Sequence, residues 1–155
     1  MAVIGVISDT HGLLRPEALA ALRGMDRILH AGDVGELEVL DALRAVAPVT
    51  AVRGNVDHGA VGRALRETEV IKIEGISIYM LHEIQKLDLR PEAAGFRVIV
   101  YGHSHRPLIE EKKGVVYFNP GSAGPRRFRL PVSVGKLVFD RGLVRAEVME
   151  LEIGE

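Results

Sequence analysis

Three short apolar segments alternate with two amphipathic segments in the first third of the chain, and this alternation constrains the fold more than any other feature. Residues 3–7, 27–30 and 48–52 are the apolar segments, and they predict strands. A helix that begins at Pro16 and a second over residues 36–46 are predicted between them. Successive strand–helix–strand units imply parallel strands.

The rest of the chain is rich in predicted strands. Three turn sequences each separate two apolar runs and predict β-hairpins. They are Glu74-Gly75, Lys112-Lys113-Gly114 and Asp140-Arg141-Gly142. A further strand is predicted over residues 98–101, and one short helix over residues 91–95. The whole pattern predicts an α/β fold with two mixed sheets packed face to face and helices outside.

Composition excludes several classes of protein. The chain has 20 basic and 21 acidic residues and a formal net charge of −1, so nucleic acid is an unlikely partner. It has no cysteine, so any metal has to be held by His, Asp, Glu or Asn. No apolar run approaches the ~20 residues of a membrane helix, and residues 1–7 do not resemble a signal peptide. A cytoplasmic protein without membrane contact is therefore expected.

Potential metal ligands follow the predicted strands, at the point where each strand ends. They are Asp9, His11, Asp33, Asn55, Asp57, His82, His103 and His105. Taken singly, each is more often a turn or a solvated residue, but their joint placement favours a metal site, because the carboxyl ends of neighbouring parallel strands converge. His30 either orients Asp33 or packs at a strand end, and His58 is expected in an exposed loop.

These motifs occur in an order that resembles the calcineurin-like metallophosphoesterase superfamily. The motifs are Asp9-x-His11, Gly32-Asp33, Gly54-Asn55-x-Asp57, His82 and Gly102-His103-Ser104-His105. Asn119-Pro120-Gly121-Ser122 is similar to a further motif of the small single-domain prokaryotic phosphodiesterases in that superfamily. The resemblance implies a four-layer α/β/β/α sandwich of two mixed β-sheets flanked by helices, in a single domain over residues 1–155. Asn119 is expected to be a turn residue or a partner of the ligands.

The resemblance also implies the ligand sets. Asp9, His11, Asp33 and His105 correspond to a first metal site. Asp33, Asn55, His82 and His103 correspond to a second, so that Asp33 bridges two divalent ions. Imidazole and carboxylate ligands favour Mn²⁺, with Ni²⁺, Fe and Zn²⁺ as alternatives. The function implied is hydrolysis of a small phosphodiester by a hydroxide that bridges the two ions.

Two positions depart from the family pattern. Val56 stands where many members carry a His that assists the leaving group, so the general acid is not identified, and Asp57 and His58 are its candidates. Glu83 follows His82 where a Gly is usual. Its carboxylate either tunes or crowds the second ion or points into solvent, and the solvated orientation is the one expected.

The sequence leaves more than one interpretation of substrate binding and of function open. Asn55, Arg126 and Arg127 are candidates for holding a substrate phosphate, and a solvated loop is the alternative for the two arginines. The competing functions are a non-catalytic protein-interaction scaffold of the same fold, a phosphomonoesterase and a DNA nuclease. The complete ligand set favours an enzyme, and nucleases of this family are longer. A homodimer through exposed hairpin edges is a further possibility.

Overall fold

The protein is described by a computed structural model over residues 1–153. The strands are β1 Ala2–Ile7, β2 Arg27–His30, β3 Val49–Ala51, β4 Thr68–Ile73, β5 Ile76–Leu81, β6 Phe96–Val100, β7 Leu108–Lys112, β8 Val115–Asn119, β9 Ser133–Asp140 and β10 Leu143–Glu150. The helices are α1 Pro16–Leu22, α2 Leu37–Arg44, α3 Gly59–Ala64 and α4 Pro91–Ala94, with a 3₁₀ turn, η1, over Ile84–Lys86. Every element predicted from the sequence is present within two residues of its expected bounds.

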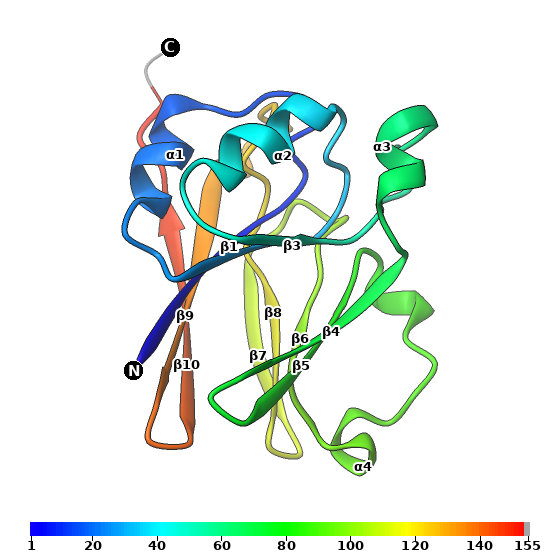
Figure 1. Ribbon diagram of the computed structural model, residues 1–155, viewed down its shortest axis with the longest axis vertical. Coiled ribbons are helices and arrows are strands. Elements are labelled where there is room, and N and C mark those ends of the chain that lie inside the picture. The colour runs from blue at the N-terminus through cyan, green and yellow to red at the C-terminus, as the bar shows by residue number, and fades with distance from the viewer. Residues whose placement is uncertain (154–155) are drawn as a thin grey trace.

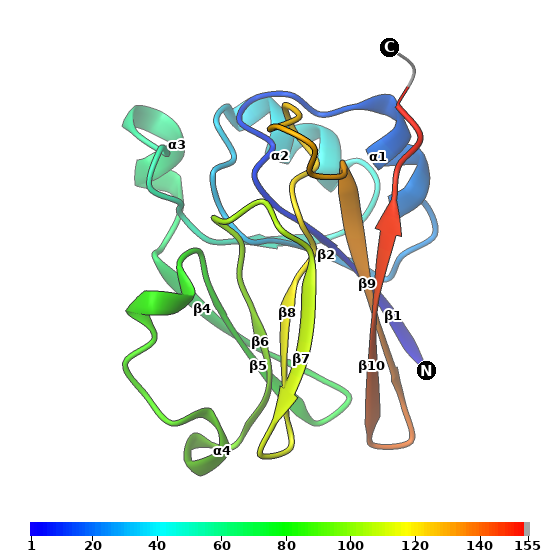
Figure 2. The ribbon, with the colours of Figure 1, turned by 180° about the vertical axis from the view of Figure 1, so that it is seen from behind.

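Two mixed sheets of five strands pack face to face (Figure 1). The first has the order β10-β9-β1-β2-β3, in which β1, β2 and β3 are parallel and β9 and β10 are antiparallel. The second has the order β4-β5-β6-β8-β7, in which β5, β6 and β8 are parallel and the two edge strands are antiparallel. The edge strands β10 and β7 lie side by side (Figure 2). The α/β class and the two mixed sheets are thus confirmed.

The core lies between the sheets. Ile4 and Val6 of β1 face Ile78 and Met80 of β5 across it, and all four side chains are buried. Alternate residues of each strand point into this layer, because side chains of a strand alternate between its two faces. Burial of these apolar side chains from water is the main term that holds the sheets together.

The two outer layers differ in thickness. Helices α1 and α2 cover the first sheet, where Leu22 and Leu43 pack against Ile7 and Ile28 (Figure 1). The second sheet is covered by the segment 84–96, which contains only η1 and the four-residue α4. The predicted fourth layer is therefore mostly loop. Over residues 1–153, no helix combines the length and apolar character that a bilayer crossing needs.

Helix α3 was not predicted from the sequence. Its six residues include two glycines, which lower helix propensity, and it is too short to show a hydrophobic period.

Candidate metal centre

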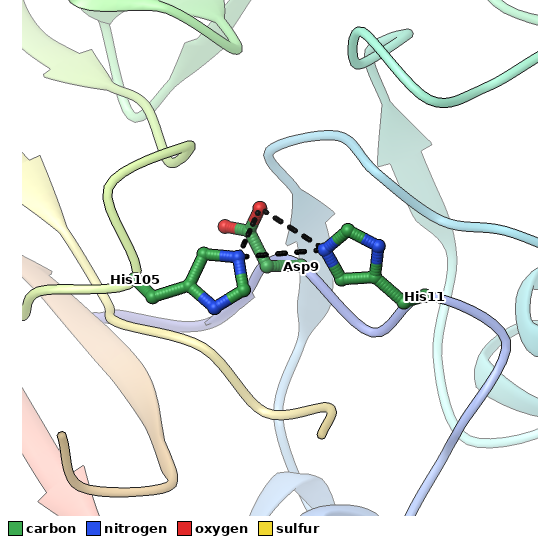
Figure 3. A group of neighbouring side chains, drawn as sticks. All are labelled: Asp9, His11 and His105. Carbon is green, nitrogen blue, oxygen red and sulfur yellow. Dashed lines mark hydrogen bonds and ion pairs between the residues drawn. The ribbon is translucent and has the colours of Figure 1, made fainter. Parts of the chain in front are cut away.

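One group of potential ligands surrounds the carboxylate of Asp9, at the end of β1 (Figure 3). Asp9 Oδ1 lies 3.4 Å from Nε2 of His105, which is on the loop after β6, and 3.9 Å from Nε2 of His11. The two imidazole Nε2 atoms are 3.4 Å apart. Asp9 and His105 are buried, and His11 is partly exposed. Three ligand atoms from two loops therefore point at one small volume.

A second group adjoins the first. Asp33 Oδ2 lies 3.1 Å from Nε2 of His82, and His103 completes this group. Asp33 Oδ2 is also 3.7 Å from Nε2 of His11, so this carboxylate reaches both groups. Asn55 Oδ1 lies 3.1 Å from Nδ1 of His103. The seven side chains that the resemblance assigns as ligands thus come together from the ends of β1, β2, β3, β5 and β6.

The backbone of these loops is held in an uncommon conformation. Asp9, His11, Asp33, His103 and His105 all have a left-handed φ, between 48° and 74°. A side chain with a Cβ adopts this region at a cost, and such residues cluster at functional sites. Hydrogen bonds between the loops sustain it: the N–H of Asp9 donates to the carbonyl of Gly32, and that of His11 to the carbonyl of Asp33.

The donor set requires a positive charge at its centre. Nδ1 of His82 lies 2.7 Å from the carbonyl oxygen of Ala31 and has to donate to it, which leaves the Nε2 lone pair facing the carboxylate of Asp33. Burial disfavours a charged His82, but hydrogen bonding to Asp33 and the charges of Asp9 and Asp33 outweigh burial and raise the pKa of His82.

The residues also fit a metal at the level of single atoms. Asp9 Oδ1 is buried and has no hydrogen-bond partner among residues 1–153, whereas Oδ2 accepts from Ser8 and from the N–H of His103. A buried carboxylate oxygen without a partner is costly unless a cation contacts it. Although burial alone would raise the pKa of Asp33, His82 and the N–H of Val56 lower it to about 2, so this carboxylate is ionised at neutral pH.

Comparison with known proteins agrees with this geometry. The family model for the calcineurin-like phosphoesterase superfamily domain matches residues 2–141. A probable metallophosphoesterase of Methanothermobacter thermautotrophicus is 35% identical over 159 residues, which cover 95% of this chain and 91% of the relative. The chain belongs to the calcineurin-like phosphoesterase superfamily.

Two further relatives of this phosphoesterase bear on its activity. Phosphodiesterase MJ0936 of Methanocaldococcus jannaschii is 26% identical over 166 residues, covering 95% of this chain and 99% of the relative. Among solved structures, wild-type Vps29 from Entamoeba histolytica complexed with Zn²⁺ is similar, with 26% identity and a TM-score of 0.72 over 96% of this chain and 98% of that one. The family and the donor set together support binding of divalent metal.

His30 is not among the candidate ligands of this phosphoesterase but contacts the loops that carry them. Its Nδ1 accepts a hydrogen bond from the N–H of Gly32 at 3.1 Å. The ring proton is therefore on Nε2, which donates to the Thr10 hydroxyl oxygen at 3.0 Å. The Thr10 hydroxyl in turn donates to the carbonyl of Val34. Complete burial lowers the pKa of His30 to about 4. A neutral His30 therefore connects the loop of Asp9 and His11 to the loop of Asp33.

Asn119 holds the loop of His103 and His105 in a similar way. Its amide nitrogen donates to the carbonyl of Gly102 and to the Ser104 hydroxyl, and its carbonyl accepts from the N–H of Gly121.

The two candidates for the general acid are placed differently. The buried carboxylate of Asp57 accepts three backbone N–H groups, from Val34, Gly35 and Gly54, at 2.9 to 3.1 Å. This geometry favours a role in holding the Asp33 and Asn55 loops over a role in proton transfer. His58 is exposed, and no hydrogen bond or ion pair joins it to the candidate ligands among residues 1–153.

Glu83 does not point into solvent, so that prediction is wrong. Its Oε1 lies 3.3 Å from Nε2 of His103, and its Oε2 lies 2.7 Å from Nζ of Lys86. Hydrogen bonding to Lys86 lowers the pKa of Glu83 and keeps it ionised.

The basic residues near the site are not those singled out in the sequence. Arg126 bonds the carbonyl of Leu130 in its own loop, and Arg127 is exposed, with no hydrogen bond or ion pair to the candidate ligands in the described chain. Instead, Arg53 and Lys86 line a hollow of about 330 Å³ beside Asn55 and His82. The position of Arg53 before Gly54-Asn55 was the available signal, because it places a guanidinium next to a candidate ligand.

Proposed function

We propose that this protein is a metal-dependent phosphodiesterase that uses two divalent ions. The observation that carries the proposal is the pair of adjoining ligand groups, which share Asp33 and surround an Asp9 oxygen without a hydrogen-bond partner. The similarity to a relative named as a phosphodiesterase supports the type of substrate.

The proposed ligands divide into two overlapping sets. Asp9, His11, Asp33 and His105 hold the first ion, and Asp33, Asn55, His82 and His103 hold the second. When bound, such ions polarise a phosphate and lower the pKa of water. Mixed imidazole and carboxylate donors favour Mn²⁺, with Ni²⁺, Fe and Zn²⁺ as alternatives. The ionised carboxylate of Asp33 gives the ligand set negative charge, and His30, Asp57 and Asn119 hold the loops in place.

The hollow beside the second set is the proposed place for one ester arm of the substrate. Asn55 lines it, together with the cations Arg53 and Lys86 and the carboxylates Glu67, Glu83 and Asp88. Three carboxylates against two cations disfavour the doubly charged phosphate of a monoester more than the singly charged phosphate of a diester. The charge of the hollow therefore supports a small phosphodiester over a phosphomonoester.

The test is hydrolysis of bis(p-nitrophenyl) phosphate beside p-nitrophenyl phosphate, after removal of metal and reloading with Mn²⁺. Nitrophenolate needs no proton to leave, so the missing general acid does not limit this assay. We expect the diester to be cleaved faster, and Asp33→Ala and His105→Ala to lower the rate by more than about 100-fold, since each removes a proposed ligand.

Asp41→Ala is the matched control, because Asp41 is an exposed carboxylate on α2 whose ion pair is with Arg44. It should leave the rate unchanged. An undiminished rate in Asp33→Ala at saturating Mn²⁺ would refute the ligand assignment.

A non-catalytic scaffold is the second candidate function. Vps29 is named for vacuolar protein sorting rather than for hydrolysis. The structural similarity to Vps29 over 96% of this chain therefore favours a scaffold. Bound Mn²⁺ with no cleavage of either compound would support the scaffold and overturn the phosphodiesterase.

A further inference from the structure

Glu83 is an additional carboxylate beside the second ligand group, and both of its oxygens have partners. Oε1 lies 3.3 Å from Nε2 of His103, and Oε2 lies 2.7 Å from Nζ of Lys86. The side chain of Glu83 is largely shielded, with 21% of it exposed. Its carboxylate is therefore held against His103 rather than free to turn in solvent.

The local sequence explains this orientation. His82 directly follows β5 and belongs to the second ligand group. The 3₁₀ turn η1 follows over Ile84–Lys86. Residues three apart nearly eclipse each other in a 3₁₀ turn, so Lys86 returns to the side of Glu83. Nζ of Lys86 pairs with Oε2 of Glu83, so that Oε1 faces His103.

The two nitrogens of the His103 ring face different acceptors. Nδ1 lies 3.1 Å from Oδ1 of Asn55, and Nε2 lies 3.3 Å from the carboxylate of Glu83. A neutral imidazole has one ring proton, and an ionised carboxylate is a stronger acceptor than an amide oxygen. The proton therefore belongs on Nε2. The lone pair of Nδ1 then faces the Asn55 oxygen at 3.1 Å, and these two acceptors repel each other unless a cation lies between them.

We propose that Glu83 is a positioning residue for the second metal ion. By accepting the Nε2 proton of His103, it fixes the tautomer in which Nδ1 is free to bind metal, and it holds the ring toward Asn55. Partnership of a metal-binding histidine with a carboxylate sets ring orientation and raises ligand basicity. The metal part of this inference rests on the two-ion site of the proposed function.

The first test is the tautomer of His103 in the metal-free protein, read from long-range ¹H–¹⁵N correlations near pH 8, above the ordinary pKa of imidazole. The signals are assigned by their absence in His103→Gln. We expect the Nε2–H form in the native protein and in Glu83→Gln, which keeps an acceptor oxygen, and a shift toward Nδ1–H in Glu83→Leu. The Nδ1–H form in the native protein would overturn the inference.

The second test is titration of the metal-free protein with Co²⁺, followed by its visible absorption. Glu83→Leu should weaken the second equivalent by about 10- to 100-fold and leave the first unchanged, and Glu83→Gln should recover most of the loss. Glu147→Leu is the matched control, because Glu147 pairs with Lys136 at 3.4 Å on the β9–β10 hairpin. Equal second affinities in Glu83→Leu and the native protein, or equal losses in Glu83→Leu and Glu83→Gln, would overturn the inference.

The two tests separate this inference from the proposed function. If the native protein binds fewer than two equivalents of Co²⁺, the two-ion mechanism fails. The tautomer spectrum then decides by itself whether Glu83 controls His103.

Discussion

At the scale of single residues, Asp57 shows how one buried side chain holds two ligand loops. Oδ2 accepts the N–H groups of Val34 and Gly54, and Oδ1 accepts that of Gly35. In Asp57→Asn, the amide NH₂ has to face at least one of these donors, which leaves either the part-buried N–H of Gly35 or the buried N–H groups of Val34 and Gly54 without an acceptor. We expect a loss of about 1–3 kcal/mol in the free energy of unfolding, measured by urea denaturation of the metal-free protein.

Asp41→Asn, an exposed carboxylate on α2, serves as the control for Asp57→Asn and should change stability little. If Asp57→Asn instead kept full stability and lost only hydrolysis, Asp57 would be the general acid and the loop-holding role would be wrong.

The candidate ligands could be predicted as residues, because each follows a predicted strand and the end of a strand has a definite place in the sheet. The direction of Glu83 could not, since it depends on η1, a turn too short to show a periodic pattern. The same limit explains why the arginine that lines the hollow is not one of those predicted from the sequence. Arg53 lines the hollow and Arg126 does not, because loop conformation rather than local charge decides which side chain reaches the site.

At the scale of elements, α1 packs closely on the first sheet at Gly5 of β1, which has no side chain. A Cβ at Gly5 would lie 2.5 Å from Cδ2 of Leu22, which is fully buried on α1. We expect Gly5→Ala to lower the free energy of unfolding by about 1–3 kcal/mol through overpacking. The double variant Gly5→Ala/Leu22→Ala should lose less than the sum of its single variants, as urea denaturation would show. Strict additivity would contradict direct contact between helix and strand.

The elements of the first sheet were predictable because parallel strands joined by helices leave a clear alternation in the sequence. The hairpins were predictable from their Gly-containing turns. The strand order was not, because β9 returns to pair with β1 over a long separation that no local pattern records. Of the thin layer over the second sheet, only the short helix α4 was predictable. The rest of the segment packs the partly buried Leu87 and Leu89 against Tyr79 from an irregular backbone.

At the scale of the whole molecule, the buried His30 makes stability depend on pH. Burial lowers its pKa to about 4, outweighing the opposing charges of Asp9 and Asp57, whereas an unfolded histidine has a pKa near 6.5. Between these values the unfolded chain binds a proton that the folded chain does not. Stability is therefore complete above about pH 6.5 and falls as pH is lowered toward 4, by as much as about 3 kcal/mol.

His30→Gln removes this titration, so we expect its unfolding free energy to fall less steeply than that of the native protein over the same interval. Urea denaturation with a chelator present, at several pH values between 4 and 7, measures both slopes. The raised pKa of His82 acts in the opposite direction, but it contributes to both proteins and cancels in their difference. His58→Gln changes an exposed histidine and should keep the native slope. Identical slopes for the native protein and His30→Gln would show that His30 is charged in the folded state. The hydrogen bonds that we assign to a neutral His30, with Gly32 and Thr10, would then be wrong.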